Sequence, residues 1–343
     1  MNQNRLYRAM GDIDEDLIEA ADRMPLTRQT RVIPARRRLA RGTLIAAVLV
    51  LLLSLGVGAY YVISHQNTAS LMEAGPMSNG GLQPQIDEAG MQIIDASAID
   101  LGLRLEDNGT VISVDSAMGF EDPTQSLLYL SFTVTPPAGY EFPEDMKHWC
   151  FWDEHFVLEP DDIPISCASS AVRNPDGSAG VLWVLMPQGN TAGHRLHIKI
   201  GGFGTADKEL AASLYDGSRE IELSGHWEFD LELPALPKTR EISLDAAALR
   251  EAGLPITALR LNEFGGIAET DQQQNPEPWQ PRELCLVYPN GSEYKLSFGR
   301  YGDNLWLNVD EQGRLFSQIL FLNPQPIWEA SELILDGVHI PLK

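Results

Sequence analysis

Three segments in the C-terminal part of the chain alternate between apolar and polar residues. A two-residue period places apolar side chains on one face of a β-strand and polar side chains on the other. The apolar members are Leu128, Leu130, Phe132 and Val134; Leu196, Ile198 and Ile200; and Trp227, Phe229, Leu231 and Leu233. We therefore expect half-buried strands here, each with one face in water.

Turn-forming dipeptides separate the strand segments, at the sequence pairs that favour tight hairpins. These pairs are Asn108-Gly109, Asp176-Gly177, Asn290-Gly291 and Asp336-Gly337. Short helices are expected over residues 206–214 and 245–252. Asp245 would cap the second helix, and Gly253 and Pro255 would end it.

Residues 43–63 form an uncharged, apolar run that differs from the rest of the chain. A helix of this length matches the roughly 30 Å hydrocarbon core of a bilayer, so we expect a transmembrane helix over 43–64. Arg36, Arg37, Arg38 and Arg41 precede the run. Because positive residues stay on the cytoplasmic side, the prediction is a single-pass membrane protein with a cytoplasmic N-terminus and extracellular C-terminal domains.

Apolar residues recur at helical spacing in the N-terminal segment, which covers residues 1–42. Leu6, Met10, Ile13 and Leu17 follow one another at intervals of four, three and four residues. A short amphipathic helix is marginal alone in water, so its apolar face needs a partner. We expect these four residues to form a partner-binding surface in the cytoplasm, with an unstructured tail as the alternative.

The C-terminal part is large for one hydrophobic core. Residues 65–90 are rich in Asn, Ser, Gly and Pro and are expected to form a flexible linker. The Pro-Ala-Leu-Pro stretch at 234–237 would separate a β-sandwich over 91–236 from a second β-rich domain over 238–343. The expected fold is a single transmembrane helix plus a mostly-β ectodomain of two immunoglobulin-like β-sandwich domains with short helices. No fixed-period repeat is visible.

The charge of the chain differs on the two sides of the apolar run. The whole chain has 25 Lys and Arg against 48 Asp and Glu, a net charge of -23. Residues 1–42 carry a net charge of +3 and residues 64–343 a net charge of -26. The acidic outer part argues against nucleic-acid binding, because phosphate contacts need clustered Lys and Arg.

The cysteines offer two kinds of chemistry. Cys150 and Cys167 are candidates for a disulfide, because an extracellular domain lies outside the reducing cytosol. Closing a loop of that size stabilises by about 3 kcal/mol. A metal site with His148 and His155 is the less favoured alternative, since the spacing matches no standard zinc motif. We expect no metal, no cofactor and no enzyme activity, because no catalytic motif can be assembled.

The order of the parts resembles a family of membrane-bound regulators of Gram-positive bacteria, described as anti-sigma factors with an extracytoplasmic domain of unknown function. The resemblance rests on the segment 11–20, GDIDEDLIEA, followed by a basic linker and a single span. In the outer part it rests on residues 127–134, 225–231 and 335–342. Residues 1–42 contain no His or Cys, so the zinc-binding anti-sigma motif is absent.

The resemblance implies that the cytoplasmic segment binds a sigma factor and that the ectodomain senses the state of the envelope. The extracellular ligand is unknown. The alternative is a membrane-anchored extracellular binding or adhesion module with no signalling role. The two hypotheses differ in whether the N-terminal helix must bind a specific protein.

Overall fold

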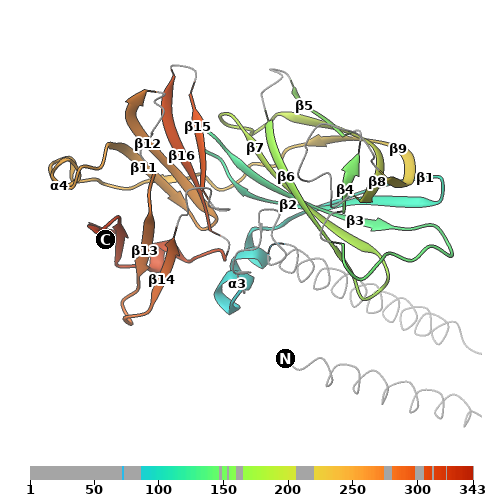
Figure 1. The fold of residues 1–343 in the computed structure, drawn as a ribbon, viewed down its shortest axis with the longest axis horizontal. Helices are drawn as coiled ribbons and strands as arrows, with labels where there is room; N and C mark the ends of the chain where they lie inside the picture. The colour runs from blue at the N-terminus through green and yellow to red at the C-terminus, as the bar shows by residue number, and fades with distance from the viewer. Residues whose placement is uncertain are drawn as a thin grey trace, which may run out of the picture. The chain divides into compact units, whose positions relative to one another are not determined.

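The computed structural model describes residues 72, 86–146, 149–152, 154–159, 165–205, 220–273, 280–297, 305–310, 313–321 and 323–342. These residues form a mostly-β structure of antiparallel sheets (Figure 1). No helix within these ranges is long and apolar enough to cross a membrane. Several predicted features lie outside the described residues: the transmembrane helix at 43–64, the helix at 206–214, and the stripe of Leu6, Met10, Ile13 and Leu17.

The first lobe consists of two sheets that share one apolar core. One sheet has the order β1-β2-β3-β7-β6; in the other, β8 pairs with β4 and β5 and also with β9. The strands are β1 (Ile99–Asp107), β2 (Thr110–Phe120), β3 (Leu127–Thr135), β4 (Trp149–Trp152), β5 (His155–Glu159), β6 (Ile165–Arg173), β7 (Ala179–Pro187), β8 (Arg195–Thr205) and β9 (Glu220–Glu232). Side chains from both sheets form a single buried cluster, so this lobe is a β-sandwich.

The second lobe has the same construction. Its sheets have the orders β10-β11-β12-β16-β15 and β14-β13-β17-β18, and they share a second buried cluster. The strands are β10 (Arg240–Glu241), β11 (Ile256–Asn262), β12 (Gly265–Gln273), β13 (Glu283–Val287), β14 (Glu293–Ser297), β15 (Leu305–Val309), β16 (Arg314–Leu320), β17 (Glu332–Leu335) and β18 (Val338–Pro341). The short helices α4 (Ala246–Glu251) and η1 (Ile327–Glu329) complete it.

The two lobes repeat one strand order. The path β2-β3-β7-β6 in the first lobe corresponds to β11-β12-β16-β15 in the second. The β8-β9 pair, with β4 and β5 beside β8, corresponds to β13-β17-β18 in the same way. In each lobe one further strand, β1 or β10, pairs with the first strand of that path. The fold is therefore duplicated although the sequence shows no repeat.

Most local predictions are confirmed. Strands β8 and β9 alternate between buried apolar and more exposed polar residues, as their sequence pattern predicts. The pairs Asn108-Gly109 and Asp336-Gly337 form two-residue hairpins, in which Asn108 and Asp336 have positive φ. Asp245 caps α4 by accepting from the backbone N–H groups of Ala247 and Ala248.

Strand β3 differs from the prediction, because both of its faces are buried. The apolar face packs in the core of the first lobe. On the other face the ring of Tyr129 lies 6.0 Å from that of Phe264 in the second lobe. The hydroxyls of Ser131 and Ser116 are hydrogen bonded at 2.7 Å beside it. At Tyr129 the expected wet face is thus covered by the neighbouring lobe, whereas Thr135 at the end of the strand is exposed as predicted.

Helix α3 (Glu88–Ser97) packs where the two lobes meet. It begins within the predicted linker, where Asp87 caps it by accepting from the Gly90 N–H at 2.8 Å. Ile94 is fully buried in a third apolar cluster with Phe120 of the first lobe and Phe264 of the second. At Gly90 an added Cβ would lie 2.0 Å from Oδ1 of Asn323, so only glycine permits this close approach.

Candidate functional site

A cleft of about 640 Å³ opens between the start of α3 and the second lobe. This volume lies in the range that holds a small ligand. The lining residues come from three segments: Asp87 and Ala89; Tyr288, Pro289, Asn290 and Ser292; and Gln325, Pro326, Trp328 and Glu329. The cleft therefore joins the helix cap to the β13–β14 hairpin and to η1.

Hydrogen bonds fix the hairpin side of the cleft. The N–H of Tyr288 donates to the carbonyl of Ser292 at 2.9 Å, which closes the turn. The Asn290 side-chain oxygen accepts from the backbone N–H and the hydroxyl of Ser292. The Tyr288 hydroxyl donates to Oε1 of the buried Gln325 at 3.0 Å. The aromatic ring of Tyr288 is thus held in place before any ligand arrives.

The ring of Trp328 forms the second aromatic wall and is half-buried. The guanidinium carbon of Arg240 lies 4.4 Å from the centroid of this ring, a cation–π contact. Arg240 precedes α4, so the contact also joins η1 to the start of the second lobe.

Two carboxylates supply negative charge to the cleft lining. Asp87 and Glu329 are exposed carboxylates on its lining. The pKa of Tyr288 is raised to about 12, first by burial and then by the negative charges of Asp87 and Glu329. At neutral pH the phenol stays protonated, so the site is suited to holding a ligand rather than to proton transfer by this group.

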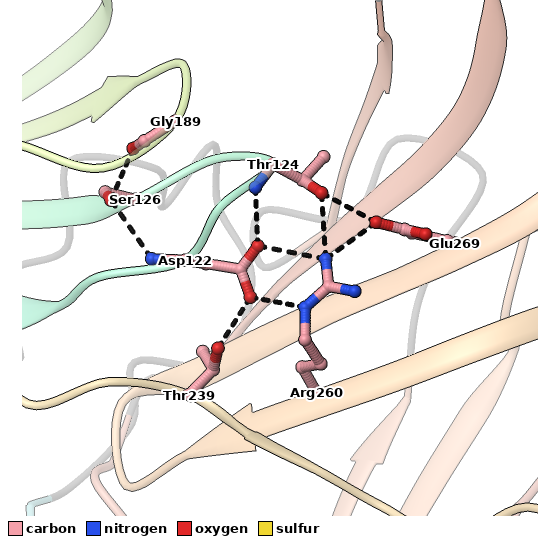
Figure 2. Close-up of polar contacts among 7 residues, drawn as sticks. All are labelled: Asp122, Thr124, Ser126, Gly189, Thr239, Arg260 and Glu269. Carbon is pink, nitrogen blue, oxygen red and sulfur yellow. Dashed lines mark hydrogen bonds and ion pairs between the residues drawn. The ribbon is translucent and has the colours of Figure 1, made fainter.

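A second polar site joins the lobes (Figure 2). The carboxylate of Asp122 is fully buried in the β2–β3 connection and accepts from Nε of Arg260 at 2.7 Å and from Nη2 at 3.0 Å. Thr239 donates to the same carboxylate at 2.6 Å. Oε1 of Glu269 accepts from Arg260 at 2.7 Å and from the Thr124 hydroxyl at 2.6 Å. These contacts satisfy a buried charge pair between the two lobes.

The charges in this network stabilise each other. Burial alone would lower the pKa of Arg260, but hydrogen bonds and charges from Asp122 and Glu269 raise it above its ordinary value. Burial alone would raise the pKa of Glu269, but the hydrogen bonds from Thr124 and Arg260 lower it. The chain segment that connects the two lobes is also hydrogen bonded to the first lobe, since the N–H of Thr239 donates to the carbonyl of Glu121 at 3.0 Å. The two lobes are thus fixed by a bidentate ion pair as well as by apolar packing.

The predicted disulfide between Cys150 and Cys167 is not formed, and both residues are thiols. Cys150 lies on β4 between the buried Trp149 and Phe151, so its side chain points away from the core. Cys167 is exposed on β6, a strand of the other sheet. Cys167 pairs with Leu185, whose side chain is in the core, so Cys167 lies on the inner face of its sheet. A bond across the sandwich would also need the Cys150 sulfur to point inward, and it does not.

Alkylation of Cys167 is expected to be slow at pH 8. The surrounding protein raises the pKa of this thiol to about 11, first by burial and then through the charge of Glu154, although the side chain reaches solvent. A smaller thiolate fraction, partly offset by higher nucleophilicity, makes the reaction about tenfold slower than that of an ordinary cysteine. Mass spectrometry of peptides after timed iodoacetamide treatment measures the alkylation rate of Cys167. This rate should rise with pH up to about pH 11. A rate that levels off near pH 9 would contradict the prediction.

Sequence reasoning did not find either polar site. Tyr288 lies two residues before the predicted Asn290-Gly291 turn, but nothing local marks it as lining a cleft. Cys150 and Cys167, the two candidates that the structure describes, lie outside the cleft lining. The four apolar residues at 6–17 lie outside the described part of the chain.

The fold defines a mostly-β protein of two joined antiparallel sandwiches, with a cleft beside α3. No family model and no curated protein matches the chain. Among solved structures, it is similar to one described as the conserved domain protein from Bacillus anthracis, with 12% identity and a TM-score of 0.42. That similarity covers 69% of this chain and 76% of the other.

Proposed function

We propose that this chain is a single-pass membrane regulator of the anti-sigma type without catalytic activity. Its C-terminal part, outside the cell, senses the state of the envelope, and residues 1–42 bind a sigma factor in the cytoplasm. The apolar run over 43–63, the arginines before it and the helical stripe of residues 6–17 support this arrangement.

The outer part is proposed to consist of two immunoglobulin-like domains. In that fold, strands A, B, E and D form one sheet in the order A-B-E-D, and strands C, F and G form the other. The order β2-β3-β7-β6 in one lobe and β11-β12-β16-β15 in the other follows the first pattern. The pairing of β8 with β4, β5 and β9, and the order β13-β17-β18, follow the second.

The position of α3 is the observation that carries the sensing proposal. This helix begins within the predicted linker, and Ile94 is buried against residues of both lobes. Its cap, Asp87, lines the cleft. A ligand in the cleft would therefore contact the element that connects the outer domains to the membrane-proximal segment. A purely adhesive module would need no such connection.

The cytoplasmic half is tested by co-purification with the full-length chain. Serine at Leu6, Met10, Ile13 and Leu17 removes the proposed apolar contact face. We expect a sigma factor to co-purify with the unmodified chain from solubilised native membranes and to be lost from this variant, because the helix then has no apolar face to dock.

A matched control carries serine at four polar positions of the same segment, Asn2, Gln3, Asn4 and Gln29. It should retain the sigma factor. If no sigma factor co-purifies with the unmodified chain, the anti-sigma proposal fails and the anchored binding module is the better description.

A further inference from the structure

The cleft combines two features that together select one kind of ligand. Tyr288 and Trp328 supply aromatic surface, and Asp87 and Glu329 supply negative charge. An anion would be repelled by the two carboxylates. A divalent metal ion takes six or more oxygen ligands at short distance, whereas much of this lining is aromatic and proline carbon.

The structure already contains one example of the interaction. The guanidinium carbon of Arg240 lies 4.4 Å from the centroid of the Trp328 ring, so this ring makes one cation–π contact within the chain. Organic cations are recognised by aromatic faces together with nearby carboxylates.

We infer that the cleft binds an alkylammonium group, with the cation near Asp87 and Glu329 and its carbon chain against Tyr288 and Trp328. Such a group occurs on lysine-type side chains and on amino sugars, and the chemistry of recognition is the same for both. The inference deepens the proposed function, because it names the chemical class of the outer signal, and its role as a signal rests on that proposal.

The same geometry explains how binding would reach the rest of the chain. The Asp87 carboxylate uses Oδ1 to accept the Gly90 N–H of α3 at 2.8 Å. Gly90 in turn lies directly against Asn323 of the second lobe. A cation beside Asp87 therefore interacts with the first turn of the helix that lies where the lobes meet, and it weakens the cap, because positive charge is unfavourable at a helix N-terminus.

The test measures binding to the full-length chain in detergent micelles by titration calorimetry. The probes form two matched pairs: Nα-acetyl-lysine amide with Nα-acetyl-norleucine amide, and glucosamine with glucose. The members of each pair differ chiefly in the ammonium group. We expect an ammonium probe to bind about fivefold or more tightly than its neutral partner, and this preference to fall as salt is added. The pair that shows the larger preference identifies the source of the group.

Two isosteric changes remove the charge and keep the fold. Asp87→Asn preserves a good helix cap, and Glu329→Gln preserves the side-chain volume. The double variant should bind the ammonium probe about fivefold more weakly at an unchanged thermal midpoint. Glu251→Gln, an exposed change on α4, is the control and should bind as the unmodified chain does.

The inference is overturned if the neutral probe of each pair binds as well as the charged one, or if the double variant keeps full affinity. Neither result depends on a sigma factor. Absence of a sigma factor from the unmodified chain would overturn the regulator proposal and leave the ligand result standing, so the two failures are distinguishable.

Discussion

Replacing Asp122 with alanine is expected to lower the free energy of unfolding by about 3–5 kcal/mol. The change leaves the guanidinium of Arg260 largely buried, with Glu269 as its remaining carboxylate partner in the network. It also removes the acceptor for the Thr239 hydroxyl and for the Thr124 N–H. Chemical denaturation followed by circular dichroism measures the loss.

Two controls separate the buried charge from charge pairing in general. Glu293→Ala breaks an ion pair of similar length, 2.8 Å to Lys295, but that pair is exposed, so stability should be nearly unchanged. The double variant Asp122→Ala with Arg260→Met should recover part of the loss, because no guanidinium is then left unpaired. Equal effects of Asp122→Ala and Glu293→Ala would contradict the role assigned to the network.

The parts of the fold that depend on local sequence could be predicted. The alternation in β8 and β9 follows directly from apolar residues two apart, and the Asp336-Gly337 hairpin follows from the positive φ that these residues tolerate. The cap of α4 at Asp245 is of the same kind. In each case the determining residues are close neighbours in the chain.

The contacts between lobes could not be predicted in this way. The alternating pattern predicts that Tyr129 lies on the solvent-facing side of its strand. In the structure its ring packs against Phe264, which is 135 positions later in the chain. Asp122 and Arg260 are 138 residues apart, and charge alone does not choose one arginine among many. The start of α3 was missed for a related reason, since its packing against both lobes outweighs the linker-like composition before it.

The shared strand order of the lobes escaped detection because topology is set by long-range pairing. In the order β2-β3-β7-β6, the central pair β3 and β7 joins strands that are distant in sequence. The second lobe has the corresponding strand order, but a different set of apolar side chains fills its core. Similarity of fold without repeated residues is expected when only the apolar pattern is needed.

The core of the first lobe depends on an aromatic cluster centred on Trp183. This side chain is 1% exposed and lies on β7. Its ring centroid is 4.5 Å from that of Phe132 on β3, 5.1 Å from Phe151 on β4 and 4.4 Å from Phe156 on β5. The contacts with Phe151 and Phe156 join one sheet of the sandwich to the other, whereas Phe132 is on a neighbouring strand of the same sheet as Trp183. This side chain therefore packs in the interior between the sheets.

Trp183→Ala is therefore expected to cost about 3–5 kcal/mol of stability, because it leaves a cavity between two sheets that cannot close without moving their backbones. Trp183→Phe should cost less, since a ring remains to pack against the three phenylalanines. Trp328→Ala removes an equally large side chain from a half-buried site and should cost less than Trp183→Ala. Urea denaturation of the three variants tests this order, and a smaller loss for Trp183→Ala than for Trp328→Ala would show that Trp183 is not central to the core.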